Sequence, residues 1–181
     1  MFRRLRLQFI TIASLAILFI LVFTVGIINT VRSFQTEQEI SKVLNTLTEN
    51  NGSFGKTKKI ETNQGHEIPL DSFRFFSVTL SGDKVVSQDT SHTSLIDDEE
   101  AVSYALAASR MTNTLGTIRE KNINLSYQVS KVSKNKILVV FLDTTSYYNS
   151  SQALLSLSIL LSLFGFIFFV VIVSALSGIV I

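Results

Sequence analysis

Two long stretches of this 181-residue sequence contain no charged residue, and this feature constrains the fold more than any other. The first comprises the 25 residues 7–31, and the second comprises the 38 residues 144–181. Residues 32–143 carry 27 charges, or 24% of their number, which is about what a soluble domain carries. The distribution excludes a single soluble globule and a polytopic transporter, and it predicts one water-soluble domain between two membrane segments.

The composition of the middle segment limits its function. It is long enough for one hydrophobic core, and the absence of cysteine excludes disulfides and thiolate metal sites. Its 13 basic and 14 acidic residues nearly cancel, so the formal net charge of +2 comes from Arg3, Arg4 and Arg6. The basic pI therefore does not indicate a nucleic-acid partner, and we expect none.

The first uncharged stretch predicts a transmembrane helix over residues 9–31. About 20 apolar residues in a helix span the hydrocarbon core of a bilayer. A cleaved signal peptide is the alternative, but its apolar region is usually about 7–15 residues long and ends at a small-residue cleavage site. Here the run is too long, and no Ala-x-Ala site follows it. We therefore expect an uncleaved anchor.

The second uncharged stretch predicts a transmembrane helix over residues 152–176, with Tyr147 and Tyr148 at the membrane interface. The three N-terminal arginines favour a cytoplasmic stub at 1–8, which makes 32–150 extracellular and 177–181 the start of a cytoplasmic linker in the plasma membrane. Ser158 and Ser162, like Ser174 and Gly178, are four residues apart. This spacing is typical of small residues at a helix–helix interface, but it also occurs among ordinary serines on a lipid-facing helix.

The middle segment has the periodicities of a mixed domain. A helical stripe of Ile40, Val43, Leu44 and Leu47 continues the first helix as far as residues 50–52. We expect a loop over 51–72, a hairpin with strands 73–80 and 84–88, a helix over 94–112, and strands 125–130 and 136–143. The helix should begin with a capping box of Ser94 and Asp97, and bury Ala101, Val102, Ala105, Leu106 and Met111.

These elements predict an α+β fold, with an antiparallel sheet and helices flanked by two transmembrane helices. The strand at 136–143 is apolar on both faces, so we expect it at the centre of the sheet. The simplest arrangement packs the helices on one face, which makes two layers. Extracytoplasmic PAS-like sensor domains have this order of elements.

Few residues of the domain suggest chemistry. Asp89, Ser91 and His92 are the residue types of a serine hydrolase. Neighbours on one loop cannot easily place a nucleophile, a base and an acid in line as a catalytic triad, so we favour a role in capping backbone groups. Asp97, Asp98, Glu99 and Glu100 could bind a cation such as Ca²⁺, although acidic residues in a first helical turn are also what the helix dipole favours. We expect no catalytic residue, no cofactor and no other metal site.

Other candidates have ordinary explanations. His66 and His92 lack the spacing of a zinc site, and we expect surface or capping roles. The basic run at 56–59 is either solvated or directed at lipid headgroups. Asn51, Asn124 and Asn149 begin glycosylation sequons, which matter only in a eukaryotic secretory pathway.

Four stretches carry a resemblance to a known family. They are MFRRLRLQFI at 1–10, RFFSV at 74–78, DTSH at 89–92 followed by DEEA at 98–101, and VVFLDT at 139–144. Together they resemble the N-terminal sensory part of two-component sensor histidine kinases of Gram-positive bacteria. The third stretch is the most specific.

The resemblance implies a homodimeric signal-input region in the lipid bilayer, which detects an unknown extracellular stimulus with a PAS-like domain. It further implies a cytoplasmic kinase that uses ATP and Mg²⁺ and phosphorylates a cognate response regulator. The sequence ends where the linker of the family would begin, so we expect a truncated chain. No histidine box or ATP motif is present, and the catalytic residues of the family carry over to no position here.

The chain by itself is therefore expected to lack catalysis, although the intact protein would be a histidine kinase. Neither His66 nor His92 is expected to accept phosphate, because both lie in the predicted external domain. The alternative hypothesis is a membrane-tethered extracellular binding or adhesion module without a signalling role.

Overall fold

The computed structural model describes residues 2–179 except 54–58, 62–66, 70–71 and 121. The chain divides into two compact units. We call Met1–Phe34 with Asn149–Ile181 the helical unit, and Gln35–Tyr148 the sheet unit.

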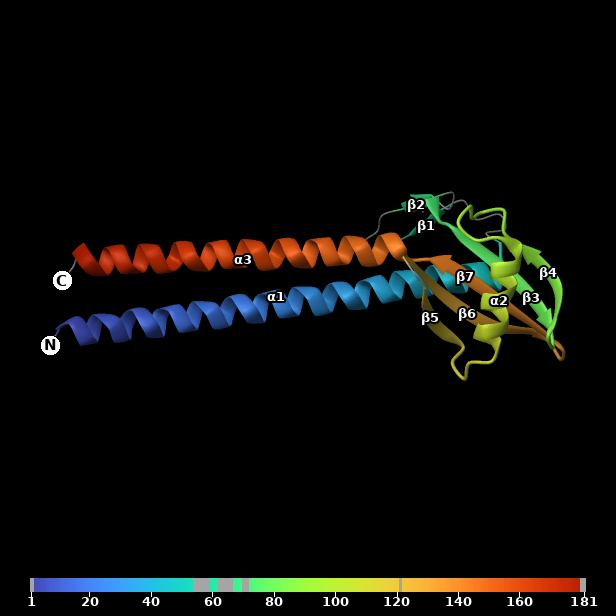
Figure 1. The fold of residues 1–181 in the computed structure, drawn as a ribbon, viewed down its shortest axis with the longest axis horizontal. Coiled ribbons are helices and arrows are strands. Elements are labelled where there is room, and N and C mark those ends of the chain that lie inside the picture. Colours follow the sequence, from blue (N-terminus) through green and yellow to red (C-terminus); the bar gives the residue numbers. More distant parts are fainter. Residues whose placement is uncertain (1, 54–58, 62–66, 70–71, 121, 180–181) are drawn as a thin grey trace. The chain divides into compact units, whose positions relative to one another are not determined.

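The sheet unit contains a five-stranded antiparallel sheet in the order β4-β3-β7-β6-β5 (Figure 1). Three of its connections are hairpins that join neighbouring strands, β3 to β4, β5 to β6 and β6 to β7. The α+β antiparallel class predicted from the sequence is confirmed. The strands are β3 (Phe75–Ser81), β4 (Lys84–Asp89), β5 (Leu115–Glu120), β6 (Ile123–Ser133) and β7 (Lys136–Asp143).

The central strand is β7, as its apolar sequence predicted. It pairs with β3 on one side and β6 on the other, and residues 139–142 are buried. Its side chains alternate between the two faces of the sheet. Leu138, Val140 and Leu142 contribute to one core, while Val139 and Phe141 contribute to another.

Helices cover both faces of the sheet, so the expectation of two layers with helices on one face is wrong. The end of α1 (Phe2–Glu49) packs on the face that carries Val140, and α2 (Asp98–Ser109) packs on the face that carries Phe141. Figure 1 shows α2 in front of the sheet and the cyan end of α1 behind it. The physical reason is that β7 is apolar on both faces, and each face needs a cover.

The apolar stripe of α1 has the predicted role. Ile40, Val43, Leu44 and Leu47 are at most 5% exposed, and they share a core with Phe75 and β7. The helix ends at the predicted place, where Asn51 and Gly52 have φ values of 56° and 84°. Gly52 N–H donates to the Leu47 carbonyl at 2.8 Å, the usual termination by left-handed residues.

The helix α2 begins later than expected. Asp97, not Ser94, is the N-cap, and its Oδ1 accepts a 2.8 Å hydrogen bond from Glu100 N–H. Of the expected buried face, Ala101 and Ala105 are buried, whereas Met111 lies beyond the helix and is exposed. Val102 and Leu106 are half-buried, and Ala108 completes the buried face.

Two further expectations need correction. The segment 51–72 contains β1 (Lys59–Glu61) and β2 (Glu67–Pro69), which pair antiparallel, although it was expected to be a loop. The strand β5 was not predicted. Its side chains are exposed or only half-buried, so it has little of the apolar alternation that marks a strand.

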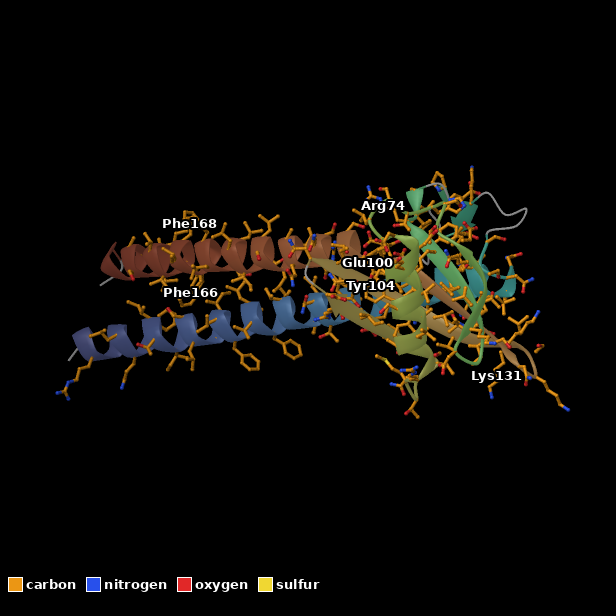
Figure 2. The ribbon with its side chains drawn as sticks, turned by 45° about the vertical axis from the view of Figure 1, so that its right-hand side comes forward. Arg74, Glu100, Tyr104, Lys131, Phe166 and Phe168 are labelled. Carbon is orange, nitrogen blue, oxygen red and sulfur yellow. The ribbon has the colours of Figure 1, made fainter. Side chains whose placement is uncertain are left out.

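The helical unit consists of the first part of α1 and most of α3 (Thr145–Ile179). Both helices are long and apolar enough to cross a membrane, and the apolar windows are not buried by protein. Phe166 and Phe168 project to opposite sides of α3 (Figure 2), so apolar side chains surround the helix. These exposed apolar surfaces are consistent with membrane spans.

Candidate functional site

The sheet unit holds the start of α3 through a connected set of polar groups. Thr144, which is fully buried, donates from its backbone N–H and its hydroxyl to the Asn124 carbonyl, at 2.8 and 3.0 Å. Thr145 N–H donates to Asp143 Oδ1 at 2.9 Å, and Thr145 Oγ1 accepts from Asn124 N–H at the same distance. The first residues of α3 are therefore hydrogen-bonded to β6 and to the end of β7.

A row of hydroxyl groups extends this anchor across the sheet. The Ser126 hydroxyl lies 3.1 Å from the Thr144 hydroxyl and 3.2 Å from that of Thr117 on β5. Near the start of α3, the ring of Tyr148 has a neighbour from β5. The guanidinium of Arg119 lies 5.3 Å from the centre of that ring. Because buried hydroxyls need partners, the contact between Ser126 and Thr144 favours the observed position of the start of α3.

The end of α1 is held to the five-stranded sheet by packing and by one polar contact, and to the separate two-stranded sheet by another. Its stripe lies in the core formed with Leu138, Val140 and Leu142 of β7. Asn45 Oδ1 accepts a 2.7 Å hydrogen bond from Gln128 Nε2 on β6, and Lys42 Nζ donates to the Glu61 carbonyl on β1. Packing against several strands fixes the rotation of this helix about its axis.

Both long helices therefore meet at one core of the sheet unit. Tyr147, on the first turn of α3, packs against the cluster that contains the α1 stripe and the alternate residues of β7. No flexible linker separates either helix from this core, because α1 is continuous to Glu49 and α3 begins two residues after β7. We take this junction as the candidate functional site, since residues of both long helices pack in this one core.

The loop at 89–92 has the structural role that was favoured for it. Asp89 Oδ1 accepts hydrogen bonds from the Ser91 hydroxyl at 2.6 Å and from Ser91 N–H at 3.1 Å. The hydroxyl bond is the main cause that holds the pKa of Asp89 below its ordinary value, with smaller help from Ser91 N–H and His92, against the opposing effect of burial. Asp89 bonds to Ser91 rather than to His92, so no hydrolase arrangement is formed.

His92 stacks on the ring of Phe75, with centroids 4.4 Å apart and planes inclined by 17°. Phe75 is 1% exposed and belongs to the core that holds α1. Thr90 donates to Asp98 Oδ1 at 2.7 Å, which ties the loop to the start of α2. The loop therefore contacts both the core of the junction, through Phe75, and the start of α2, through Asp98.

The acidic start of α2 does not form a metal centre in the described part of the chain, where no three His, Cys, Asp or Glu side chains converge. Asp97 caps the helix and Asp98 accepts from Thr90. Glu99 and Glu100 are exposed in the first turn, where the helix dipole favours them.

On α2, Tyr104 has an environment unlike that of an ordinary surface phenol. Figure 2 shows it one turn from Glu100, and its ring lies 6.4 Å from that of Phe141. Burial, followed by the hydrogen bond with Glu120 and the charges of Glu120 and Glu100, raises the pKa of Tyr104 to about 12. Its hydroxyl therefore stays protonated, and it connects α2 to β5.

The remaining candidates are dispersed. His66 and the basic residues 56 and 58 lie outside the described residues, while Lys59 pairs with Glu67 at 2.6 Å. Of the sequon asparagines, Asn51 lies in the turn after α1, Asn124 is hydrogen-bonded to the start of α3, and Asn149 lies within α3.

Sequence reasoning missed the hydroxyl row entirely. Thr117, Ser126 and Thr144 are distant in the sequence and of common types. The pairing of β5 with β6 brings the first two together, and the pairing of β6 with β7 adds the third. A comparison with protein-family models finds no match for this chain, and a comparison with curated proteins finds none either.

Proposed function

We propose that this chain is the signal-input region of a membrane-bound sensor histidine kinase. In this proposal the sheet unit is an extracellular PAS-like domain, the long helices cross the plasma membrane, and α3 passes the signal to a cytoplasmic kinase. The observation that supports it most is the junction, where both long helices join the same core without a linker.

The physical argument rests on stiffness. A domain that only displays a binding surface functions equally well on a flexible tether, and it needs one anchor. A domain that signals must convert a small change of packing into a displacement of the helices, which requires direct attachment. The buried stripe of α1 and the hydrogen-bonded start of α3 provide that attachment at both helices.

In the proposed mechanism, two packings of the junction differ in their affinity for the stimulus. A stimulus shifts the equilibrium only as far as it binds one packing better than the other. The homodimer implied by the family resemblance would then bring two copies of α3 under the control of two sheet units. The cytoplasmic N-terminus favoured by Arg3, Arg4 and Arg6 gives this topology.

The test fuses residues 1–181 to the cytoplasmic half of a well-characterised sensor kinase and measures autophosphorylation in membrane vesicles. No stimulus is needed, because a core substitution can itself bias the two packings. Val140→Ala, which removes two methyl groups from the junction, should change the rate by about fivefold or more, the usual size of a coupling between sites. Inserting Gly-Gly after Asn149 should abolish this effect while leaving membrane insertion intact.

A matched control inserts Gly-Gly after Ser53, in the described end of the turn that follows α1. This insertion should leave the effect of Val140→Ala unchanged. If Val140→Ala lowers the melting temperature of the sheet unit and the kinase rate stays constant, the signalling proposal is wrong, and the tethered binding module is favoured.

A further inference from the structure

A small cavity of about 100 Å³ lies between α1 and α3 within the helical unit. Its lining contains both polar and apolar residues. The polar residues are Asn29, Arg32, Ser151 and Ser158, and the apolar residues are Val25, Ile28, Leu154 and Leu155.

The charge in this cavity has no partner in the described part of the chain. Arg32 is exposed and forms no ion pair with any described carboxylate. The next acidic residues on α1 are Glu37 and Glu39, five and seven positions away, whereas residues three or four apart face each other on a helix. The guanidinium is therefore free to bind an external anion.

The position of the cavity along the helices limits the kind of anion. Arg32 is the first charged residue after the 25 uncharged residues of α1. In a membrane, such a residue lies at the level of the lipid headgroups, where basic side chains attract anionic lipids. Val25 and Leu155, two of the apolar lining residues, suit the glycerol and the first carbons of an acyl chain.

The donors in the cavity match a phosphate group. A guanidinium binds two phosphate oxygens through parallel hydrogen bonds, a geometry that an ammonium group cannot provide. The hydroxyl of Ser151 and the amide of Asn29 can donate to the remaining oxygens. Ser158 lies seven residues further along α3, about 10 Å away along the helix axis, and lines the part of the cavity that would hold the lipid beyond its phosphate. The donors to the phosphate come from both helices, so one bound phosphate would contact α1 and α3 together.

We propose that this cavity binds the phosphate of an anionic phospholipid, which thereby sets the separation of α1 and α3. The proposal requires the helical unit to lie in a membrane, but it does not depend on the signalling role proposed above. It assigns Arg32 as the principal contact, and Asn29 and Ser151 as the supporting donors.

The test uses the full chain purified in a neutral detergent, with phosphatidylglycerol, phosphatidylcholine and inorganic phosphate as probes. Native mass spectrometry measures the lipid retained, and the melting temperature of the chain measures stabilisation, because a ligand that binds only the folded form must raise it. Phosphatidylglycerol should be retained and should raise the melting temperature more than phosphatidylcholine. Inorganic phosphate should compete with the lipid at high concentration.

Three variants distinguish specific lipid binding in the cavity from non-specific attraction between charges. Arg32→Gln should weaken phosphatidylglycerol binding by about tenfold or more, as expected for the loss of hydrogen bonds to a charged group. Arg4→Gln makes the same change at the other end of α1, and should preserve this binding. Ser158→Leu keeps every charge but fills the cavity, and it should weaken binding as Arg32→Gln does.

The proposal is overturned if Arg4→Gln and Arg32→Gln weaken binding equally, or if Ser158→Leu binds like the unmodified chain. The assignment of the phosphate to a lipid is overturned if inorganic phosphate raises the melting temperature of the chain and phosphatidylglycerol raises it no further.

Discussion

Gln128 on β6 donates a 2.7 Å hydrogen bond from Nε2 to Oδ1 of Asn45 on α1, across 83 residues of sequence. This bond joins a strand next to the centre of the sheet to the helix whose other end lies in the helical unit. It is a polar contact beside an apolar core, so it adds direction to packing that is otherwise non-directional.

The first prediction concerns this pair. Gln128→Ala and Asn45→Ala should each lower the free energy of unfolding, and the double variant should lose less than the sum, with a coupling of about 0.5–1.5 kcal/mol. Tyrosine fluorescence during denaturant unfolding of the full chain can measure this. The four tyrosines all lie in the sheet unit and tryptophan is absent, so the helical unit adds no signal. Strictly additive losses would contradict a direct bond.

The second prediction concerns the α1 stripe. Leu44 is fully buried, so Leu44→Ala should leave a cavity and lower the free energy of unfolding by about 2–5 kcal/mol. Leu15→Ala makes the same change on the same helix at a residue that is 68% exposed, and it should leave the unfolding of the sheet unit unchanged. Equal losses from the two variants would mean that α1 does not pack specifically on the sheet.

The third prediction concerns the contact between Gly116 and Tyr127. A Cβ at Gly116 would lie 2.5 Å from the Tyr127 hydroxyl, whose ring is buried and packs against Phe141. The hydroxyl also donates to Met111 Sδ at 3.0 Å, so it cannot move aside without losing that bond. Gly116→Ala should therefore destabilise the sheet unit by about 1–3 kcal/mol.

Two measurements check this explanation. Gly26→Ala adds the same methyl group where nothing lies within 4 Å, and the sheet unit should unfold as before. Adding Tyr127→Phe to Gly116→Ala should recover only part of the loss, because the ring carbons also lie under 3 Å from the new Cβ. Full stability of Gly116→Ala alone would contradict the close packing.

The fourth prediction distinguishes the observed helix cap from the expected one. Asp97→Ala removes the acceptor for Glu100 N–H and should cost about 1 kcal/mol of unfolding free energy. Ser94→Ala should have little effect, because Ser94 is exposed and precedes the helix by four residues. Denaturant midpoints of the two variants provide the comparison. A larger loss of unfolding free energy from Ser94→Ala would support the capping box predicted from the sequence.

The fifth prediction concerns pH. Because the pKa of Asp89 is lower in the folded chain than its ordinary value, ionised Asp89 contributes stability above a pH of about 3.9. That stability is lost as the pH falls through the lowered pKa. Ser91→Ala removes the main hydrogen bond, so it should lower the melting temperature near neutral pH and progressively less in acid. Ser94→Ala serves as the control, and a Ser91→Ala deficit that is independent of pH would contradict the assignment.

The sequence predicted the elements whose side chains have a clear period. The α1 stripe, the β3–β4 hairpin and the central place of β7 all follow from apolar spacing, and the structure confirms them. The second helical layer was also predictable in principle. A central strand that is apolar on both faces needs a cover on each, and the economical two-layer arrangement ignored this requirement.

Other features depend on tertiary contacts that no local pattern reveals. The start of α2 is set by Ile96, which is buried in the same core as Ala101, as in a hydrophobic staple, so the cap falls at Asp97. The strand β5 lies at an exposed edge, where little apolar burial is required. The hydroxyl row that anchors α3 joins groups from three separate segments.

The central position of β7 has a consequence for biosynthesis. The hairpins β3–β4 and β5–β6 are formed from local sequence, but only β7 joins them, and it is the last strand to leave the ribosome. Until then, each hairpin exposes an unpaired edge and an apolar face. Because α3 begins two residues after β7, the sheet can be completed only when synthesis has reached the start of that helix. The aggregation-prone stage of folding therefore lasts until almost the whole of the sheet unit has been synthesised.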